Sequence, residues 1–169
     1  MLVLAQSAPA RAGSFAPDGT FLFDPAAAAH IDFEDATPPD GATVNEDAGA
    51  LSGTHVVSLP QYQGVDLAVT VPKTRSTYRV SAWIRDGDVT GSVEIDYGDR
   101  TSEVAGLYPT GRMTSDGWIE VANDRIRVDG ARVTALKVGL FSAGGAVADA
   151  IEVVPDGDES AFPTTPNAA

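Results

Sequence analysis

Short runs in which apolar and polar side chains alternate make up most of the chain from about residue 30 onward. Successive side chains of a β-strand point to opposite faces, so this period of two is typical of strands with one buried face. Gly, Pro, Asp and Asn, which favour turns, separate the runs. The predicted strands are His30–Glu34, Thr54–Leu59, Val65–Val71, Tyr78–Arg85, Ser92–Tyr97, Trp118–Val128 with a break near Asn123, Val133–Phe141 and Val147–Val154. This spacing predicts an all-β fold, an antiparallel β-sandwich of two sheets.

The 169 residues divide into three stretches. Residues 1–27 form a leader or linker with a short apolar segment, in which Ala10-Arg11-Ala12 follows the A-x-A pattern of a secretory cleavage site. A basic n-region is missing, so this stretch is either a signal remnant or a linker. Residues 28–155 form the sandwich domain, and Asp24–Ala29 predicts one or two helical turns where it begins. Residues 156–169 are rich in Pro and Thr, which is typical of a linker to other domains of a longer protein.

Charge and composition exclude several classes of partner and chemistry. The chain has 24 acidic and 11 basic side chains, for a net charge of −13. It would repel phosphate backbones, so a nucleic-acid partner is excluded. No run approaches the roughly 18 apolar residues of a membrane span, so we expect no membrane insertion. Cys is absent, which excludes disulfides, thiol catalysis and thiolate metal sites.

Four segments carry a resemblance to a known group of modules. They are Asp32-Phe33-Glu34-Asp35, Gly53–Leu59, Tyr78–Arg85, and the closing run from Gly117 through Leu136–Phe141 and Gly144-Gly145 to Ala148–Ile151. Taken in order, they resemble the calcium-containing jelly-roll carbohydrate-binding modules of the broad group around families 4, 9 and 22. YRVSAWIR at Tyr78–Arg85 is the most specific match, and the whole resemblance covers roughly residues 30–154. Two departures are the Asp149-Ala150 pair, where a doubled Asp is usual, and the long segment Gly98–Asp116.

The resemblance implies a jelly-roll sandwich with a structural Ca²⁺. Glu34 near the start and Asp149 near the end would meet if the first and last strands are neighbours, as they are in the jelly roll. Calcium takes about six to eight oxygen ligands. The resemblance therefore implies that these two carboxylates and backbone carbonyls hold the ion. The alternative is that both are ordinary surface acids.

Alternation along the strands also predicts a binding face. It places Val80, Ala82 and Ile84 in the core and the intervening Trp83 and Arg85 on the opposite face. If the strands share one sheet, as in the resembling modules, Trp83 and Phe141 are aromatic platforms on a concave surface. The charged side chains expected around them are Arg85, Glu94, Asp96 and Lys137. Alternatively, a loop covers Trp83 as a second small core and the charges form a solvated face.

These observations predict a noncatalytic carbohydrate-binding module of a secreted or cell-surface protein, with an oligosaccharide or polysaccharide as partner. A sugar ring has an apolar C–H face and a rim of hydroxyls, which suits flat aromatics beside polar groups. Tyr62 and Tyr108, the latter before Pro109, both lie in loop-like sequence and are candidate contacts at the rim of the site.

Two other functions stay open. One is a structural or adhesion jelly-roll domain that binds no sugar. The other is a small glycoside hydrolase or lyase, in which Glu94 and Asp96 would be the paired carboxylates. The sequence shows no recognisable nucleophile or acid/base constellation, so we do not expect an enzyme.

Overall fold

The computed structural model describes residues 14–18, 20–23, 29–31, 42–61, 63–71, 77–99 and 102–155. This part of the chain is all-β. Its strands are β1 (Ser14–Phe15), β2 (Phe21–Leu22), β3 (Ala29–Ile31), β4 (Thr43–Glu46), β5 (His55–Leu59), β6 (Gln63–Val69), β7 (Thr77–Arg85), β8 (Val89–Asp96), β9 (Ser102–Met113), β10 (Ile119–Arg127), β11 (Ala135–Ser142) and β12 (Ala146–Pro155). The predicted helical turns fall on residues outside the described ranges, except Ala29, which begins β3. Within those ranges, no helix is long and apolar enough to cross a membrane.

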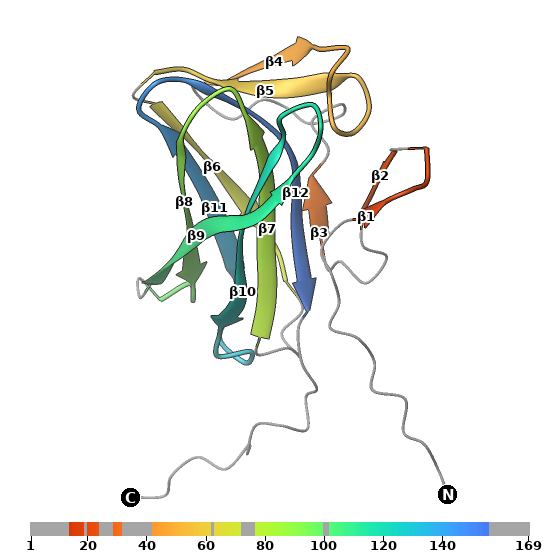
Figure 1. The fold of residues 1–169 in the computed structure, drawn as a ribbon. Coiled ribbons are helices and arrows are strands. Elements are labelled where there is room, and N and C mark those ends of the chain that lie inside the picture. Colours follow the sequence, from red (N-terminus) through yellow and green to blue (C-terminus); the bar gives the residue numbers. More distant parts are fainter. Residues whose placement is uncertain are drawn as a thin grey trace, which may run out of the picture.

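The strands form two packed antiparallel sheets, which confirms the predicted sandwich. The hydrogen-bonded order is β4-β5-β12-β7-β10-β9-β8-β11-β6, and β3 also pairs with β12. Strand β9 belongs to both layers, because its first half pairs with β8 and its second half with β10. In Figure 1 it runs obliquely from β8 across to β10 and β7. We call the layer with β3, β4, β5, β12, β7, β10 and the second half of β9 sheet I, and the layer with β6, β11, β8 and the first half of β9 sheet II.

Strand β9 lies within Gly98–Asp116, the segment for which the sequence indicated no strand and only an unusual length. Gly106, Pro109 and Gly111 interrupt its alternation. Pro109 cannot donate a backbone hydrogen bond, and prolines in sheets are therefore found where a strand lacks a neighbour on one side. Here the pairing with β8 ends at Leu107, and Pro109 is paired only with Val121 of β10. The proline thus stands where β9 leaves sheet II.

The core between the sheets is built from the inward faces that alternation predicted. Val80 and Ala82 of β7 are fully buried, as are Val93 of β8 and Leu136 and Val138 of β11. Burying an aliphatic side chain of this size contributes about 1.5–3 kcal/mol. The faces were predicted correctly, but the grouping of strands was wrong. Strand β7 lies in sheet I, whereas β8 and β11 lie in sheet II.

A second core covers the outer face of sheet I. Trp83 and Trp118 are each 1% exposed and cluster with Phe21. The N-terminal hairpin β1–β2 covers Trp83, because the rings of Phe15 and Phe21 meet it edge-on at centroid distances of 5.6 and 5.9 Å. The guanidinium of Arg112 lies 5.2 Å from the Trp83 ring centroid. The prediction that Trp83 is an exposed platform is therefore wrong. Alternation assigned it to the outer face but carried no information about what covers that face.

Beside this second core lies a buried carboxylate. Glu120 of β10 is 0% exposed, and its Oε1 accepts hydrogen bonds from Arg79 Nη2 and Arg112 Nη1, both at 3.0 Å. Thr110 Oγ1 donates to its Oε2 at 2.8 Å. A buried charge is tolerated only when it is paired and hydrogen-bonded in this way. The second core and this ion cluster together close much of the outer face of sheet I.

Replacing Trp83 by Ala tests the second core. We expect Trp83→Ala to lower the free energy of unfolding by about 3–5 kcal/mol, because it removes a fully buried aromatic ring. The matched variant Phe141→Ala removes a ring that is 43% exposed and should cost much less. Urea denaturation of both variants, followed by circular dichroism, measures the difference. Equal, small losses would show that Trp83 is accessible.

Candidate functional site

The outer face of sheet II is open to solvent and carries most of the predicted site. The strand register aligns its outward side chains in rows across the sheet. In the middle row Gly139, Ser92 and Gly106 lie opposite one another on β11, β8 and β9. These residues are small, while the neighbouring rows carry larger side chains. We call this row, together with the larger side chains on either side of it, the trough.

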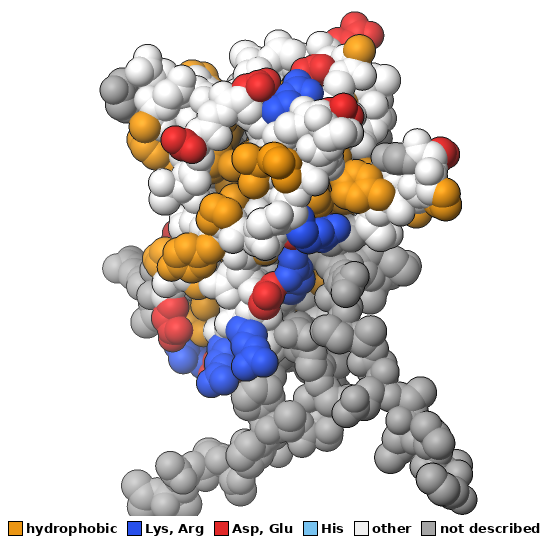
Figure 2. Space-filling view, viewed as in Figure 1, with side chains coloured by type: hydrophobic (Ala, Val, Ile, Leu, Met, Phe, Trp, Pro, Cys, Tyr) orange, Lys and Arg blue, Asp and Glu red, His pale blue; other side chains and the backbone are white. Residues whose placement is uncertain are grey.

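Two exposed aromatic rings stand along one side of the trough. Phe141 pairs with Thr90 and is 43% exposed. Tyr108 is 66% exposed and follows Gly106 by two residues on the same side of β9. Tyr108 pairs with Ala122 of β10, so it begins the half of β9 that belongs to sheet I, and its ring reaches back to the row of Gly106. Figure 2 shows hydrophobic side chains gathered along the path of β9.

The Tyr108 ring lies directly over the backbone of Gly106. A Cβ at position 106 would lie 2.7 Å from Tyr108 Oη and 2.8 Å from its Cζ. Only glycine leaves room for the ring in this position. Asn123 Nδ2 of β10 donates a hydrogen bond of 2.8 Å to the carbonyl of Gly106. The phenol end of Tyr108 thus lies over Gly106, and the side chain remains 66% exposed.

Charged side chains line the other side of the trough. Lys137 Nζ lies 3.4 Å from Asp96 Oδ2 and 3.9 Å from Glu94 Oε1. Asp96 Oδ1 accepts a hydrogen bond of 2.7 Å from Gly98 N. This backbone N–H, and after it Lys137, holds the pKa of Asp96 below its ordinary value. The three side chains are 31–41% exposed, so their polar atoms remain available to ligand hydroxyls.

The structure brings four of the six predicted ligand-binding residues together and separates the other two. Glu94, Asp96, Lys137 and Phe141 share the outer face of sheet II, whereas Trp83 and Arg85 lie on sheet I. Ionic and hydrogen-bonding partners already engage the Arg85 side chain, which binds Asp47, Asp86 and the carbonyl of Gly49. Its guanidinium lies 4.6 Å from the Trp118 ring centroid. The expectation that Arg85 joins Lys137 around one ligand is therefore wrong.

Tyr108 is the aromatic that sequence reasoning misplaced. It was expected in a rim loop, but it lies on strand β9 beside the trough. The interrupted alternation of β9 concealed the strand. The available signal was Gly106 two residues before the tyrosine, since a glycine on the same face of a strand can leave room for a ring.

The predicted calcium ligands are only partly within the described residues. Asp149 of β12 is 0% exposed, and its Oδ2 accepts hydrogen bonds from Leu51 N at 2.6 Å and Ser52 N at 3.1 Å. Glu34 lies outside the described residues. Within the described ranges there is no group of three or more His, Cys, Asp or Glu side chains that could hold a metal. The calcium site stays a prediction.

Known proteins match this chain in fold but not in sequence. No family model and no curated protein sequence matches the chain. A family 22 module of Paenibacillus barcinonensis, described as a xylan-binding domain, superposes with a TM-score of 0.56 at 15% identity, over 76% of this chain and 94% of that one. The chain has the fold of the family 22 carbohydrate-binding modules. At such identity the likeness shows a shared jelly-roll sandwich.

Two structures from Clostridium thermocellum agree with this family 22 fold. The C-terminal family 22 module of xylanase 10B matches with a TM-score of 0.54 at 16% identity, over 78% of this chain and 96% of that one. A longer chain holds the N-terminal family 22 module and the family 10 glycoside hydrolase module, in complex with xylohexaose. It matches with a TM-score of 0.55 at 12% identity, over 85% of this chain and 30% of that one.

The lowered pKa of Asp96 predicts a pH dependence of stability. A carboxyl whose pKa falls on folding stabilises the fold above its unfolded pKa of about 3.9, and this contribution is lost as the pH falls through the folded pKa. We expect an NMR titration of the Asp96 carboxyl to show a midpoint below the ordinary value. Lys137→Met should raise that midpoint only partly, because the Gly98 N–H is the larger cause. A full return to the ordinary value would contradict this assignment.

Proposed function

We propose that this protein is a noncatalytic carbohydrate-binding module that binds a glycan chain in the trough on sheet II. The observation that carries the proposal is the Tyr108 ring, which rests on Gly106 and is 66% exposed. An exposed aromatic ring suits the apolar face of a sugar ring, and burying such an aromatic typically contributes a large share of binding energy.

The rest of the trough supplies the groups that sugar hydroxyls need. Ser92 lies within it, and Thr90 lies in the row of Phe141. Lys137 offers donors, while Glu94 and Asp96 accept hydrogen bonds. Gly139 and Ser92 leave space for a chain that crosses the strands as far as the Tyr108 ring over Gly106. A glycan in this direction contacts both aromatic rings.

Charge favours a neutral glycan. The three ionic groups beside the trough, Lys137, Glu94 and Asp96, carry one positive and two negative charges. The whole chain has a net charge of −13, which repels a polyanionic chain. The neighbours of the same fold are described as xylan-binding or are in complex with xylohexaose. Xylohexaose is therefore the first probe that we propose for this trough.

The same comparison supports a cellular context. In one matching structure a family 22 module is part of a longer chain with a glycoside hydrolase module. We propose that this chain is likewise an accessory module of a secreted or surface protein, where it holds the protein on its polysaccharide.

Tyr108→Ala tests the proposed site. We expect the affinity for xylohexaose to fall at least about tenfold, because the variant removes the exposed stacking surface. The free energy of unfolding should change by less than about 1 kcal/mol, since Tyr108 is mostly exposed. Isothermal titration calorimetry and urea denaturation provide the two measurements. The control is Leu22→Ala, which removes another exposed hydrophobic side chain, 48% exposed, from the hairpin.

Gly106→Ala probes the same platform without removing it. Its new Cβ meets the far end of the Tyr108 side chain, so the ring must move while the sheet stays intact. Affinity should fall in this variant as well. If wild type binds neither xylohexaose nor any member of a broad panel of neutral glycans, a structural or adhesion role replaces this proposal. Binding that is unchanged in both variants would place the glycan elsewhere.

We also propose, as the sequence resemblance implies, that a calcium ion stabilises the fold. A ligand that binds only the folded state contributes about 2.7 kcal/mol at a hundred times its dissociation constant. Chelation should therefore lower the melting temperature of the wild type, and Glu34→Ala should abolish the difference. Differential scanning calorimetry with calcium or with a chelator measures this. Identical melting in both conditions would exclude the ion.

A further inference from the structure

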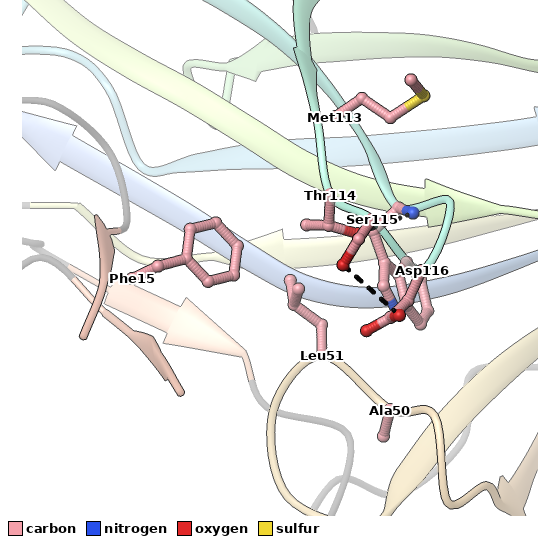
Figure 3. Close-up of a pocket in the computed structure, with 8 residues that line it drawn as sticks. Phe15, Ala50, Leu51, Met113, Thr114, Ser115 and Asp116 are labelled. Atoms are coloured by element: carbon pink, nitrogen blue, oxygen red, sulfur yellow. Dashed lines mark hydrogen bonds between the residues drawn. The ribbon is translucent and has the colours of Figure 1, made fainter. Parts of the chain in front are cut away.

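A pocket of about 310 Å³ lies on sheet I, outside the trough. Three separate parts of the chain form its walls. Phe15 comes from the N-terminal hairpin, Leu51 from the loop between β4 and β5, and Met113 to Asp116 from the turn between β9 and β10. Trp118 also lines the pocket. Figure 3 shows the Phe15 ring and Leu51 on one side and the turn that carries Thr114, Ser115 and Asp116 on the other.

Buried polar groups fix the loop wall of this pocket. The carboxylate of Asp149, fully buried in β12, accepts hydrogen bonds from the backbone N–H groups of Leu51 and Ser52. The carbonyl of Gly49, in the same loop, accepts hydrogen bonds from Arg85 Nη1 at 2.8 Å and Trp118 Nε1 at 2.9 Å. Arg85 and Asp149 were expected to bind sugar and calcium, respectively. In the structure both position this loop.

The opposite wall is fixed by its own turn. Thr114 N donates to the carbonyl of Trp118 at 2.9 Å, and Trp118 N donates to Thr114 Oγ1 at 3.1 Å. Gly117 N donates to the carbonyl of Thr114 at 3.2 Å. Hydrogen bonds therefore hold two of the three walls in place, and walls that are already ordered lose little conformational entropy on binding.

The lining combines two kinds of surface. Met113 is 70% exposed and Phe15 is 39% exposed, so apolar surface remains accessible at the pocket. Ser115 and Asp116 are exposed, with Ser115 Oγ 3.5 Å from Asp116 Oδ1, and they offer a hydroxyl and a carboxylate at the rim. A small ligand with one apolar face and several hydroxyls matches this lining. The volume is at the lower end of the range for small-molecule sites, which suits one ring rather than a chain.

We propose that this pocket is a second carbohydrate site, which takes a single neutral pyranose ring at the end or at a branch of a glycan. Apolar contact with Phe15 and Met113 holds one face of the ring. Asp116 and Ser115 bind its hydroxyls. The residues involved are separate from those of the trough, so each site can be tested without the other.

The experiment is a titration of the full chain with methyl β-xyloside, methyl β-glucoside and methyl β-galactoside, followed by ¹H–¹⁵N NMR. The chain has two tryptophans, so the Trp118 indole N–H gives one of only two such signals. We expect saturable shifts of this signal and of residues 113–117 with at least one of the probes. Asp116→Asn should weaken that binding about tenfold, because it removes a charged hydrogen-bond acceptor. Glu103→Gln, at an exposed acid near the other end of β9, is the charge-matched control.

Each outcome decides between the two sites. Absence of saturable shifts at residues 113–118 with all three probes would overturn the second site. Shifts confined to Gly106, Tyr108 and Phe141 would also overturn it, while supporting the trough. Shifts at the pocket that Asp116→Asn leaves unchanged would refute the assigned contacts. If xylohexaose leaves the trough unshifted while a methyl glycoside binds the pocket, the proposed function of the trough fails and the second site stands.

Discussion

The transfer of strand β9 from one sheet to the other determines which surfaces this protein can present. Its first half pairs with β8 and its second half with β10, so the strand joins the two layers at one edge. Pro109 and the glycines around it permit the change of partner, because neither residue type favours a strand with continuous hydrogen bonding to neighbours on both sides. The outward residues of the first half lie on sheet II. Met113, at the end of the second half, lies beside the covered face of sheet I.

Much of the architecture could be predicted from alternation alone, because side-chain period determines which residues face a core. Val80, Val93 and Leu136 were all assigned to the buried face, and all three are fully buried. Alternation contains no information about which strands are neighbours, so β7 and β11 were grouped in one sheet although they lie in two. Because the alternation of β9 is interrupted, sequence analysis did not recognise the strand that lies between β7 and β11 in the sheet order.

For the candidate site, too, the sequence could predict only which residues of one strand share a face. Phe141 and Lys137 share a face because four residues, two full periods of a strand, separate them along β11. The prediction for Trp83 failed because Phe15 and Phe21 cover its ring. These two residues belong to a hairpin distant in sequence, and no local pattern connects that hairpin to β7. The prediction for Tyr108 failed for a local reason, because its ring lies where a side chain at position 106 would be and so requires Gly106. Side-chain periodicity does not indicate which distant segment covers a sheet face, or where a glycine leaves room for a neighbouring ring.

The central position of β12 has a consequence for how the chain reaches this structure. The strand is the last described element in sequence, yet it pairs with β3, β5 and β7, and Ile151 pairs with Ile31 near the other end of the domain. Contacts between residues so far apart in sequence require closing long loops before they yield any stabilisation, which slows folding. Until Ala146–Pro155 is available, the edges of β5 and β7 lack the partner they have in the finished sheet. A chain of this topology can therefore complete its central sheet only after almost the whole domain has been synthesised.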